Sequence, residues 1–264
     1  MIATAIQHHL RFRSRPGDSR LWHLHESLAD RGHRSDGIAG PEWAVSSPSM
    51  ELNDWVRMWE EGSTAFHQGE TNKVLEAFAE QVFGENIGRA FVPLSGKTLD
   101  MVFLAERADE VVGVEIAEQA VQEFFAERTE QPEISAGPPL VYSAAKYRLF
   151  VADFFAIETE LTGPIDAVFD RAALVALDAE TRVRYAHQLA GMLRVGAKIL
   201  LVTFDYDQAQ MAGPPFAVSD DEVQELFGSA FDIERLQKRD VLNDHFRAVG
   251  LSSMTESAFA LTKL

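Results

Sequence analysis

Short apolar runs alternate with amphipathic stretches along most of this chain. The apolar runs have the length of buried strands and are FVPL (residues 91–94), EVVGVE, YRLFVAD, IDAVFD and KILLVTFDY. The stretches between them repeat apolar residues at helical spacing and include KTLDMVFLAER, EQAVQEFFAERT and TRVRYAHQLAGMLRVG, the last closed by Gly196. Because strands that alternate with helices build a mostly parallel sheet covered on both faces, the pattern predicts an α/β fold.

Two further patterns flank this region. Residues 51–83 have helical spacing with a break at Gly62, and Trp55 and Trp59 share one helix face because they lie four residues apart. Near the other end, DDEVQELFG predicts a helix, and FDIERLQKRD and SAFALTKL predict two final strands that we expect to pair antiparallel. We interpret GPPLVYSA, before the third strand, as a loop or an excursion of the chain.

The segment from Arg89 to Glu115 has the pattern of half a nucleotide-binding unit. A strand, a tight turn at Gly96, a helix and a second strand ending on an acid follow one another within it. Glu115 lies 19 positions after Gly96, close to the roughly 20-residue spacing at which an acidic residue meets a ribose diol. The turn has one glycine instead of G-x-G-x-x-G, which favours an adenosine cofactor without a pyrophosphate, such as S-adenosylmethionine. Glu115 as a solvated strand end is the alternative.

Polar residues and a glycine follow the carboxyl ends of four predicted strands. These ends are residues 94–97, Glu115, Asp153, and Asp170 with Arg171. Because a doubly wound sheet binds its ligand beyond the carboxyl ends of its strands, we expect these residues to converge on one crevice.

Charge and composition exclude several kinds of partner. With 24 basic and 41 acidic residues, the formal net charge is −17, and such a surface repels phosphate backbones and anionic membranes. The chain has no cysteine, so it has no disulfide and no Cys–Zn site. No paired-His motif predicts a metal centre after residue 49, and no apolar run approaches the ~18 residues that span a bilayer. We therefore expect a cytoplasmic protein that binds neither nucleic acid, membrane nor metal.

The first 49 residues differ from the rest. They contain six Arg, no Lys and five of the eight His, and their apolar periodicity is weak. We interpret residues 1–49 as a flexible appendage and residues 50–264 as the folded domain. Since the compact pattern begins at Met50, a wrongly assigned start is a second interpretation.

Five segments in order resemble the thiopurine S-methyltransferase family over roughly residues 52 to 264. They are WVRMWEEGSTAFHQGETN, FVPLSGKTLDMVFLA, VVGVEIAEQAVQEFF, FDRAALVALDAETRVRYA and GPPFAVSDDEVQELF. The resemblance implies a Rossmann-like class I methyltransferase that uses S-adenosylmethionine. It also implies a seven-stranded, mostly parallel sheet with helices on both faces, a helical N-terminal cover over the site, and a monomer.

The family motifs assign roles to individual residues. The implied cofactor contacts are Trp59, Leu94, Gly96, Glu115, Asp153, Phe154 and Arg171. Phe66 would face the methyl acceptor, and Arg171 would act in catalysis by holding the methionine carboxylate or an anionic acceptor.

Each role has a structural alternative. Trp55 and Trp59 could both be core residues, although we expect Trp55 in the core and Trp59 toward the ligand. Asp153 could cap a helix instead of meeting adenine. Arg171 could pair with the neighbouring Asp170, and Phe66 could simply pack.

Two residues depart from the family pattern. Ser95 stands in PLSGK where the family has cysteine, which is a small change in shape. His245, in DHFRAVG, stands where the family has an arginine on the acceptor side of the pocket, and Arg247 follows two residues later. We count His245 as a candidate substrate contact, and the departure leaves the acceptor open.

The expected activity is methyl transfer from S-adenosylmethionine to a small soft nucleophile, with an aromatic or heterocyclic thiol as the first choice. Halide, sulfide and oxyanions of selenium or tellurium are alternative acceptors. A catalytically silent cofactor-binding member and an NAD-dependent oxidoreductase are alternatives from other classes.

If Met50 is the true start, the native protein lacks residues 1–49. Intact-mass measurement of the protein from its own cells should then give a chain that begins at Met50. A native mass that includes residues before Met50 would disprove this start.

Overall fold

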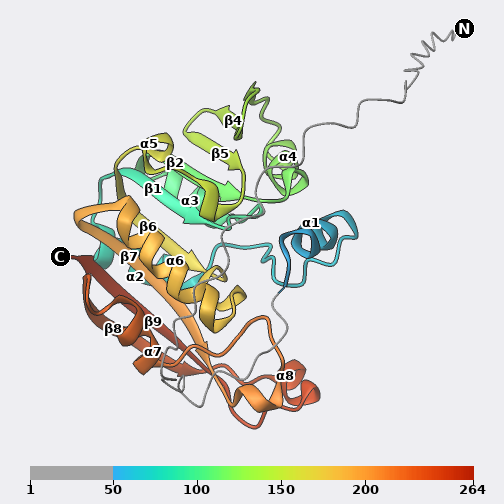
Figure 1. Ribbon diagram of the computed structural model, residues 1–264, viewed down its shortest axis with the longest axis vertical. Helices are drawn as coiled ribbons and strands as arrows, with labels where there is room; N and C mark the ends of the chain where they lie inside the picture. Colours follow the sequence, from blue (N-terminus) through green and yellow to red (C-terminus); the bar gives the residue numbers. More distant parts are fainter. Residues whose placement is uncertain (1–49) are drawn as a thin grey trace, which may run out of the picture. The chain divides into compact units, whose positions relative to one another are not determined.

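The computed structural model describes residues 50–264, in which nine strands form one sheet (Figure 1). The strands are β1 (Ile87–Pro93), β2 (Ala108–Glu115), β3 (Glu133–Ser135), β4 (Leu140–Ala144), β5 (Tyr147–Val151), β6 (Ile165–Arg171), β7 (Leu193–Asp205), β8 (Phe231–Asp240) and β9 (Thr255–Lys263). Their order across the sheet is β3-β4-β5-β2-β1-β6-β7-β9-β8. The predicted appendage, residues 1–49, lies outside the described residues and stays a prediction.

The five central strands are parallel, and β9 pairs antiparallel with both β7 and β8. The predicted antiparallel pair at the end of the chain is therefore confirmed. The sheet has two strands more than the predicted seven, because β3 and β4 extend it antiparallel beyond β5. Our interpretation of GPPLVYSA as a loop is wrong for its second half: the Tyr142 ring in β4 stacks on Phe125, and its hydroxyl donates to Glu118 at 2.6 Å.

Helices cover both faces of the sheet, as the alternating pattern predicts. The α-helices are α1 (Leu52–Glu60), α2 (Lys73–Phe83), α3 (Asp100–Ala105), α4 (Glu118–Glu127), α5 (Thr159–Thr162), α6 (Ala179–Met192), α7 (Asp220–Phe227) and α8 (Asp244–Val249). Short 3₁₀ turns are η1 (Phe154–Ala156), η2 (Leu174–Ala176) and η3 (Gln208–Gln210). One core joins α2, α3 and α4 to the sheet, and the other core joins α6 and α7 to the opposite face. Within residues 50–264 no helix is both long and apolar enough to cross a membrane.

The predicted helix end at Gly196 is wrong. Helix α6 ends at Met192, and β7 begins at the next residue. Gly196 has φ +83° and lies where the pairing of β7 with β6 shifts register, between Leu193 and Lys198. The glycine therefore serves an irregularity in a strand, a position that also requires a left-handed backbone.

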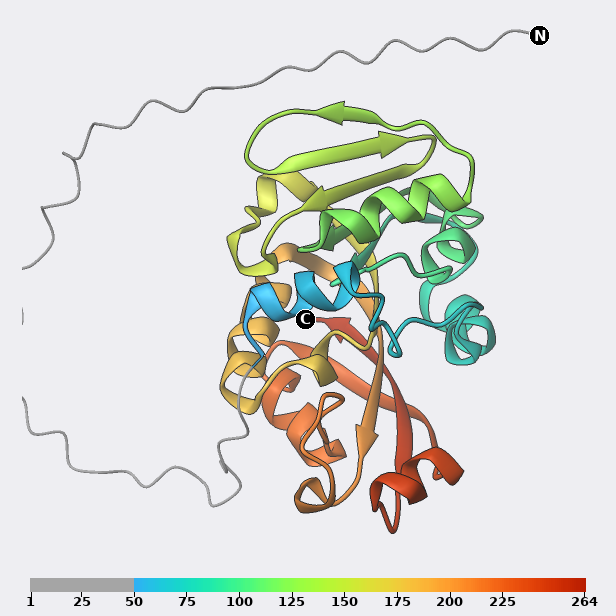
Figure 2. The ribbon, with the colours of Figure 1, turned by 90° about the vertical axis from the view of Figure 1, so that its right-hand side faces the viewer.

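Helix α1 forms the predicted N-terminal cover. Figure 2 shows it beside α4, and the two helices are in contact. Trp59 packs there against Ala117 and Ala120. Because an isolated helix of 9 residues is marginal in water, this packing is what holds α1 in place.

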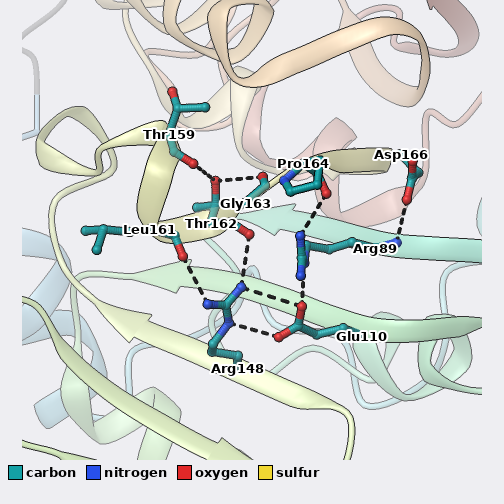
Figure 3. Close-up of polar contacts among 9 residues, drawn as sticks. All are labelled: Arg89, Glu110, Arg148, Thr159, Leu161, Thr162, Gly163, Pro164 and Asp166. Carbon is teal, nitrogen blue, oxygen red and sulfur yellow. Dashed lines mark hydrogen bonds and ion pairs between the residues drawn. The ribbon is translucent and has the colours of Figure 1, made fainter.

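Near the amino-terminal ends of the parallel strands, Glu110 of β2 joins its own strand to β1 and β5 (Figure 3). Its carboxylate pairs with Arg89 of β1 and with Arg148 of β5, the latter at 2.9 Å. The two arginines also donate to backbone carbonyls before β6, Arg89 to Pro164 and Arg148 to Thr162, each at 3.0 Å. One carboxylate thus fixes β1, β2 and β5 against the segment that leads into β6.

Replacing Glu110 by Gln should lower the free energy of unfolding by about 1 kcal/mol, because two partly exposed arginines lose their charged partner. Urea denaturation with an unchanged slope measures this. Asp109→Asn, on the exposed neighbour, is the control and should change stability by less than about 0.5 kcal/mol. Equal effects of the two substitutions would contradict the role of Glu110.

Candidate active site

The turn after β1 is strained and tightly packed. Leu94 has φ 45° and Gly96 has φ 49°, a left-handed conformation that costs a non-glycine residue of order 1–3 kcal/mol and is found at ligand sites. A Cβ on Gly96 would lie 2.9 Å from the indole of Trp59. The turn therefore requires glycine at position 96, both for its backbone angle and for its contact with the cover.

Glu115 at the end of β2 fastens this turn. Its carboxylate is buried (5 % exposed) and accepts from the backbone N–H of Gly96 and of Ala117, both at 2.8 Å. Burial raises the pKa of Glu115, whereas the backbone donors lower it. Because a carboxylate can accept about four hydrogen bonds, Glu115 keeps capacity to accept a ribose hydroxyl. The remaining acceptor capacity of this carboxylate fits the predicted cofactor role of Glu115.

Three aromatic side chains of the cover gather beside the turn. The ring of Phe66 lies edge-on to Trp55 at 5.7 Å and to Trp59 at 5.6 Å. Contrary to our expectation, Trp59 is the more deeply buried of the two indoles, since it packs on Gly96 and on α4. The ring of His67 lies 6.2 Å from that of Trp59. Burial and the neighbouring Lys97 lower the pKa of His67.

Arg171 at the end of β6 reaches the same cover segment. Its Nη1 donates to the carbonyl of Phe66 at 2.9 Å. Its Nε is buried and has no partner among the described residues. Burial lowers the pKa of the guanidinium, and Asp100 and Glu256 raise it. The structure thus brings Phe66 and Arg171 together, and the free donor suits a bound anion.

Asp170 does not pair with Arg171. Its side chain is fully buried on the other face of the sheet and accepts from the Tyr185 hydroxyl at 2.7 Å and from the Leu174 N–H at 3.1 Å. Burial raises the pKa of Asp170 to about 6. The alternative of a plain Asp170–Arg171 ion pair is wrong, because adjacent residues of a strand point to opposite faces.

Sequence reasoning missed Asp100. This buried carboxylate accepts from the Asn72 N–H at 2.7 Å and from the Thr98 hydroxyl at 2.8 Å. It therefore ties the start of α2 to the loop that follows the glycine turn. Asp100 is the fourth residue of the predicted helix KTLDMVFLAER, and an acid in a first helical turn usually interacts only with its own helix. The sequence therefore held no signal for this contact.

The cap alternative for Asp153 is the contact that the structure contains. Its Oδ1 accepts from the Phe155 N–H at 2.9 Å and begins η1. Phe154 is buried, with its ring 4.9 Å from that of Tyr185 and 6.4 Å from that of Phe91. The adenine contacts predicted for Asp153 and Phe154 stay predictions.

The family model for thiopurine S-methyltransferase matches residues 50–264. A thiopurine S-methyltransferase of Pseudomonas fluorescens is 39% identical over 217 residues, which cover 81% of this chain and 98% of the relative. One of Nitrosospira multiformis is 41% identical over 215 residues, covering 80% and 98%.

The chain belongs to the thiopurine S-methyltransferase family. It is an S-adenosylmethionine-dependent methyltransferase, which confirms the predicted family, enzyme class and cofactor.

Solved structures confirm the class I methyltransferase fold. A 1,6-didemethyltoxoflavin-N1-methyltransferase of Burkholderia thailandensis, bound to S-adenosylhomocysteine, superposes with a TM-score of 0.57 at 14% identity, covering 81% of this chain and 87% of that one. An S-adenosylmethionine-dependent methyltransferase of Anabaena variabilis has a TM-score of 0.56 at 13% identity and covers 84% and 98%.

The two residues that depart from the thiopurine S-methyltransferase pattern lie in different surroundings: Ser95 is buried and His245 is exposed. The hydroxyl of Ser95 is buried without a hydrogen-bond partner among the described residues, so the family's cysteine would avoid an unsatisfied donor there. His245 is exposed on α8, where its ring meets Phe246, and Arg247 pairs with Asp244 at 3.3 Å. No contact within residues 50–264 joins His245 to Phe66 or Arg171, and its role as a substrate contact stays a prediction.

No group of three His, Asp or Glu side chains within residues 50–264 is arranged to hold a metal ion.

Asp170 should make folding depend on pH. The folded state keeps the carboxyl proton up to about pH 6, whereas the ordinary value is 3.8, so the folded state binds more protons between these values. The contribution of this group to the free energy of unfolding is therefore most favourable below about pH 4 and falls by about 3 kcal/mol as pH rises from about 4 to 6.

Urea denaturation of the wild type and of Asp170→Asn across pH 4 to 7 isolates that contribution as a difference, because other buried carboxyls are common to both. Asp109→Asn should keep the wild-type profile. Parallel profiles of wild type and Asp170→Asn would show that Asp170 does not titrate in this range.

Proposed function

We propose that this protein transfers the methyl group of S-adenosylmethionine to the sulfur of a small aromatic or heterocyclic thiol. The observation that carries the proposal is the contact between Arg171 and Phe66, which places a partly buried cation beside an aromatic cluster at the carboxyl ends of the strands. Flat aromatic rings pack well against Trp55 and Phe66, and the guanidinium favours the ionised sulfur. The names of the relatives point to the same acceptor class.

We infer the cofactor-holding residues from the donors and acceptors that the site offers. Glu115 would accept the ribose hydroxyls, and the backbone of Leu94 and Gly96 would allow close approach. Trp59 would cover the cofactor, with cation–π attraction to its sulfonium. Arg171 would pair either with the cofactor carboxylate or with an anionic acceptor, and the second pairing is the one that holds a thiolate acceptor. Asp153 and Phe154 would meet the adenine.

S-Adenosylmethionine supplies an electrophilic methyl group on a good leaving group. The protein therefore needs little acid–base chemistry, and its own contribution is alignment and exclusion of water. Trp59 and Phe66 supply apolar surface that displaces water from the acceptor. Arg171 would hold the acceptor sulfur as a thiolate and orient it, since aromatic thiols ionise readily near neutral pH.

An inorganic acceptor is the second candidate. The Arg171 Nε has no partner among the described residues, and a small anion such as halide, sulfide or a selenium or tellurium oxyanion suits such a donor. A silent member of the family is less consistent with the chain, which carries Glu115, Asp153 and Arg171 together. We further propose that the protein acts as a cytoplasmic monomer without nucleic-acid or membrane partners, in keeping with its charge of −17.

Transfer of label from methyl-labelled S-adenosylmethionine to a panel of thiols, halides and oxyanions tests the proposal. We expect the label on aromatic thiols, with slower transfer to inorganic anions. Label on the inorganic acceptors alone would favour the second candidate, and transfer to none of them would reject both.

Glu115→Ala should weaken binding of S-adenosylmethionine more than tenfold, because it removes the charged acceptor of the ribose hydroxyls. Isothermal titration calorimetry measures the change, and Glu80→Gln, on the exposed side of α2, serves as control. Since Glu115 also holds Gly96, Glu115→Gln is a second variant that keeps one acceptor oxygen. Its affinity for S-adenosylmethionine should lie between those of the wild type and Glu115→Ala. Wild-type affinity in Glu115→Ala would reject the ribose assignment.

A further inference from the structure

Charged side chains of alternating sign lie across the sheet next to the acceptor side of the site. Arg171 of β6 is opposite Val202 of β7, and two residues later on β7 Phe204 is opposite Glu256 of β9, which in turn is opposite Arg239 of β8. Residues that face each other across neighbouring strands point to the same face, as do residues two apart along one strand. Arg171, Glu256 and Arg239 therefore share one face of the sheet.

The same set lies at the edge where the site is. Strands β6, β7 and β8 run in the same direction, and Arg171 and Arg239 are at or next to their carboxyl ends. The first residues of β9 meet this edge because β9 runs the opposite way. Glu256 is the one acid of β9 (Thr255–Lys263) and stands at its second position, so it lies near the acceptor side.

Glu256 is built into the fold as a charged group. Only 6 % of it is exposed, and its Oε1 accepts from Arg239 Nε at 2.8 Å and Nη2 at 2.7 Å. The Arg239 side chain is 47 % exposed, so water solvates the rest of that charge. Burial lowers the pKa of Arg171, whereas Asp100 and Glu256 act in the opposite direction, in keeping with the position of Glu256 on the same face of the sheet as Arg171.

We propose that Glu256 determines which acceptors the site takes, by offsetting the charge of Arg171 so that acceptors with an additional negative charge are disfavoured. The inference rests on the proposed function of the site. Asp100 already uses its oxygens on Asn72 and Thr98, so the two acids differ. Asp100 positions the cover, whereas Glu256 is held only by Arg239 among the described residues and adjusts the local field.

Coulomb's law gives the order of magnitude of the effect. A unit charge about 10 Å from another in a partly buried site changes binding on the order of five-fold. Glu256→Gln keeps the shape of the side chain and removes one negative charge. It should therefore raise the preference for a carboxylated acceptor by about that factor.

The experiment compares 4-mercaptobenzoate with 4-methylbenzenethiol, which share the reacting sulfur and differ by one carboxylate. The ratio of their kcat/KM values is measured for the wild type, Glu256→Gln, Arg239→Gln and the double variant. We expect the ratio to move about five-fold toward the carboxylated thiol in Glu256→Gln, mainly through KM, and in the opposite direction in Arg239→Gln. The double variant restores the local charge and should return toward the wild-type ratio.

Glu234→Gln makes the same chemical change on β8 at an exposed position farther from Arg171 and should leave the ratio unchanged. A Glu256→Gln ratio within two-fold of wild type would overturn the proposal. So would an equal loss of activity toward both thiols, because a purely structural role lowers both alike.

A binding measurement separates this proposal from the proposed function. Quenching of tryptophan fluorescence by each thiol reports its affinity without turnover. If the wild type binds but methylates neither thiol, the proposed function fails, and the shift in relative affinity in Glu256→Gln still decides the role of Glu256. An unchanged relative affinity would overturn that role.

Discussion

The buried carboxylate of Glu115 is the interaction on which the rest of the site depends. It receives the N–H groups of Gly96 and Ala117, so one side chain fixes the loops that follow two adjacent parallel strands. A buried carboxylate without such donors would cost several kcal/mol, and the strained turn at residues 94–96 would lose its support. The two loops and the acid therefore hold one another in one fixed geometry.

The fixed turn in turn positions the cover, which is too short to fold alone. Trp59 packs on the face of Gly96 where a side chain would clash. The following segment is attached at two more points, the Phe66 carbonyl on Arg171 and the Asn72 N–H on Asp100. Arg171 ends β6, and Asp100 begins α3, which follows the glycine turn. The segment that carries Phe66 is therefore placed by the carboxyl-terminal edge of the sheet and by the turn after β1. Arg171 supports the cover, and its Nε still has no partner among the described residues.

The parts of this arrangement that local pattern determines could be predicted from the sequence. The strands ending near Leu94, Glu115 and Arg171, and the covering helix with Trp59, follow from periodicity and motif. The β3–β4 hairpin could not be predicted, since β4 is held by Tyr142 packing on α4, a contact between distant residues. The sequence predicts a helix end at Gly196, because a glycine with a left-handed backbone suits both a helix end and a strand irregularity. Asp170, Asp100 and Glu256 each bond to a residue from another part of the chain, and local sequence does not encode which parts of the chain meet.

Charge explains why the acceptor side depends on a few buried groups. The chain carries a formal charge of −17, yet salt screens exposed charges beyond about 8–10 Å, so the acidic surface affects approach more than the bound state. Burial protects charges in the site from screening by salt, and the degree differs among Arg171, Glu256 and Arg239. In the Glu256–Arg239 pair, Glu256 is the more buried side chain. His245 lies exposed on α8 and has no contact with Arg171 among the described residues. Selection by charge therefore falls to the balance between Arg171 and its neighbouring carboxylates. This balance can change by one residue without disturbing Glu115 or the turn that it holds.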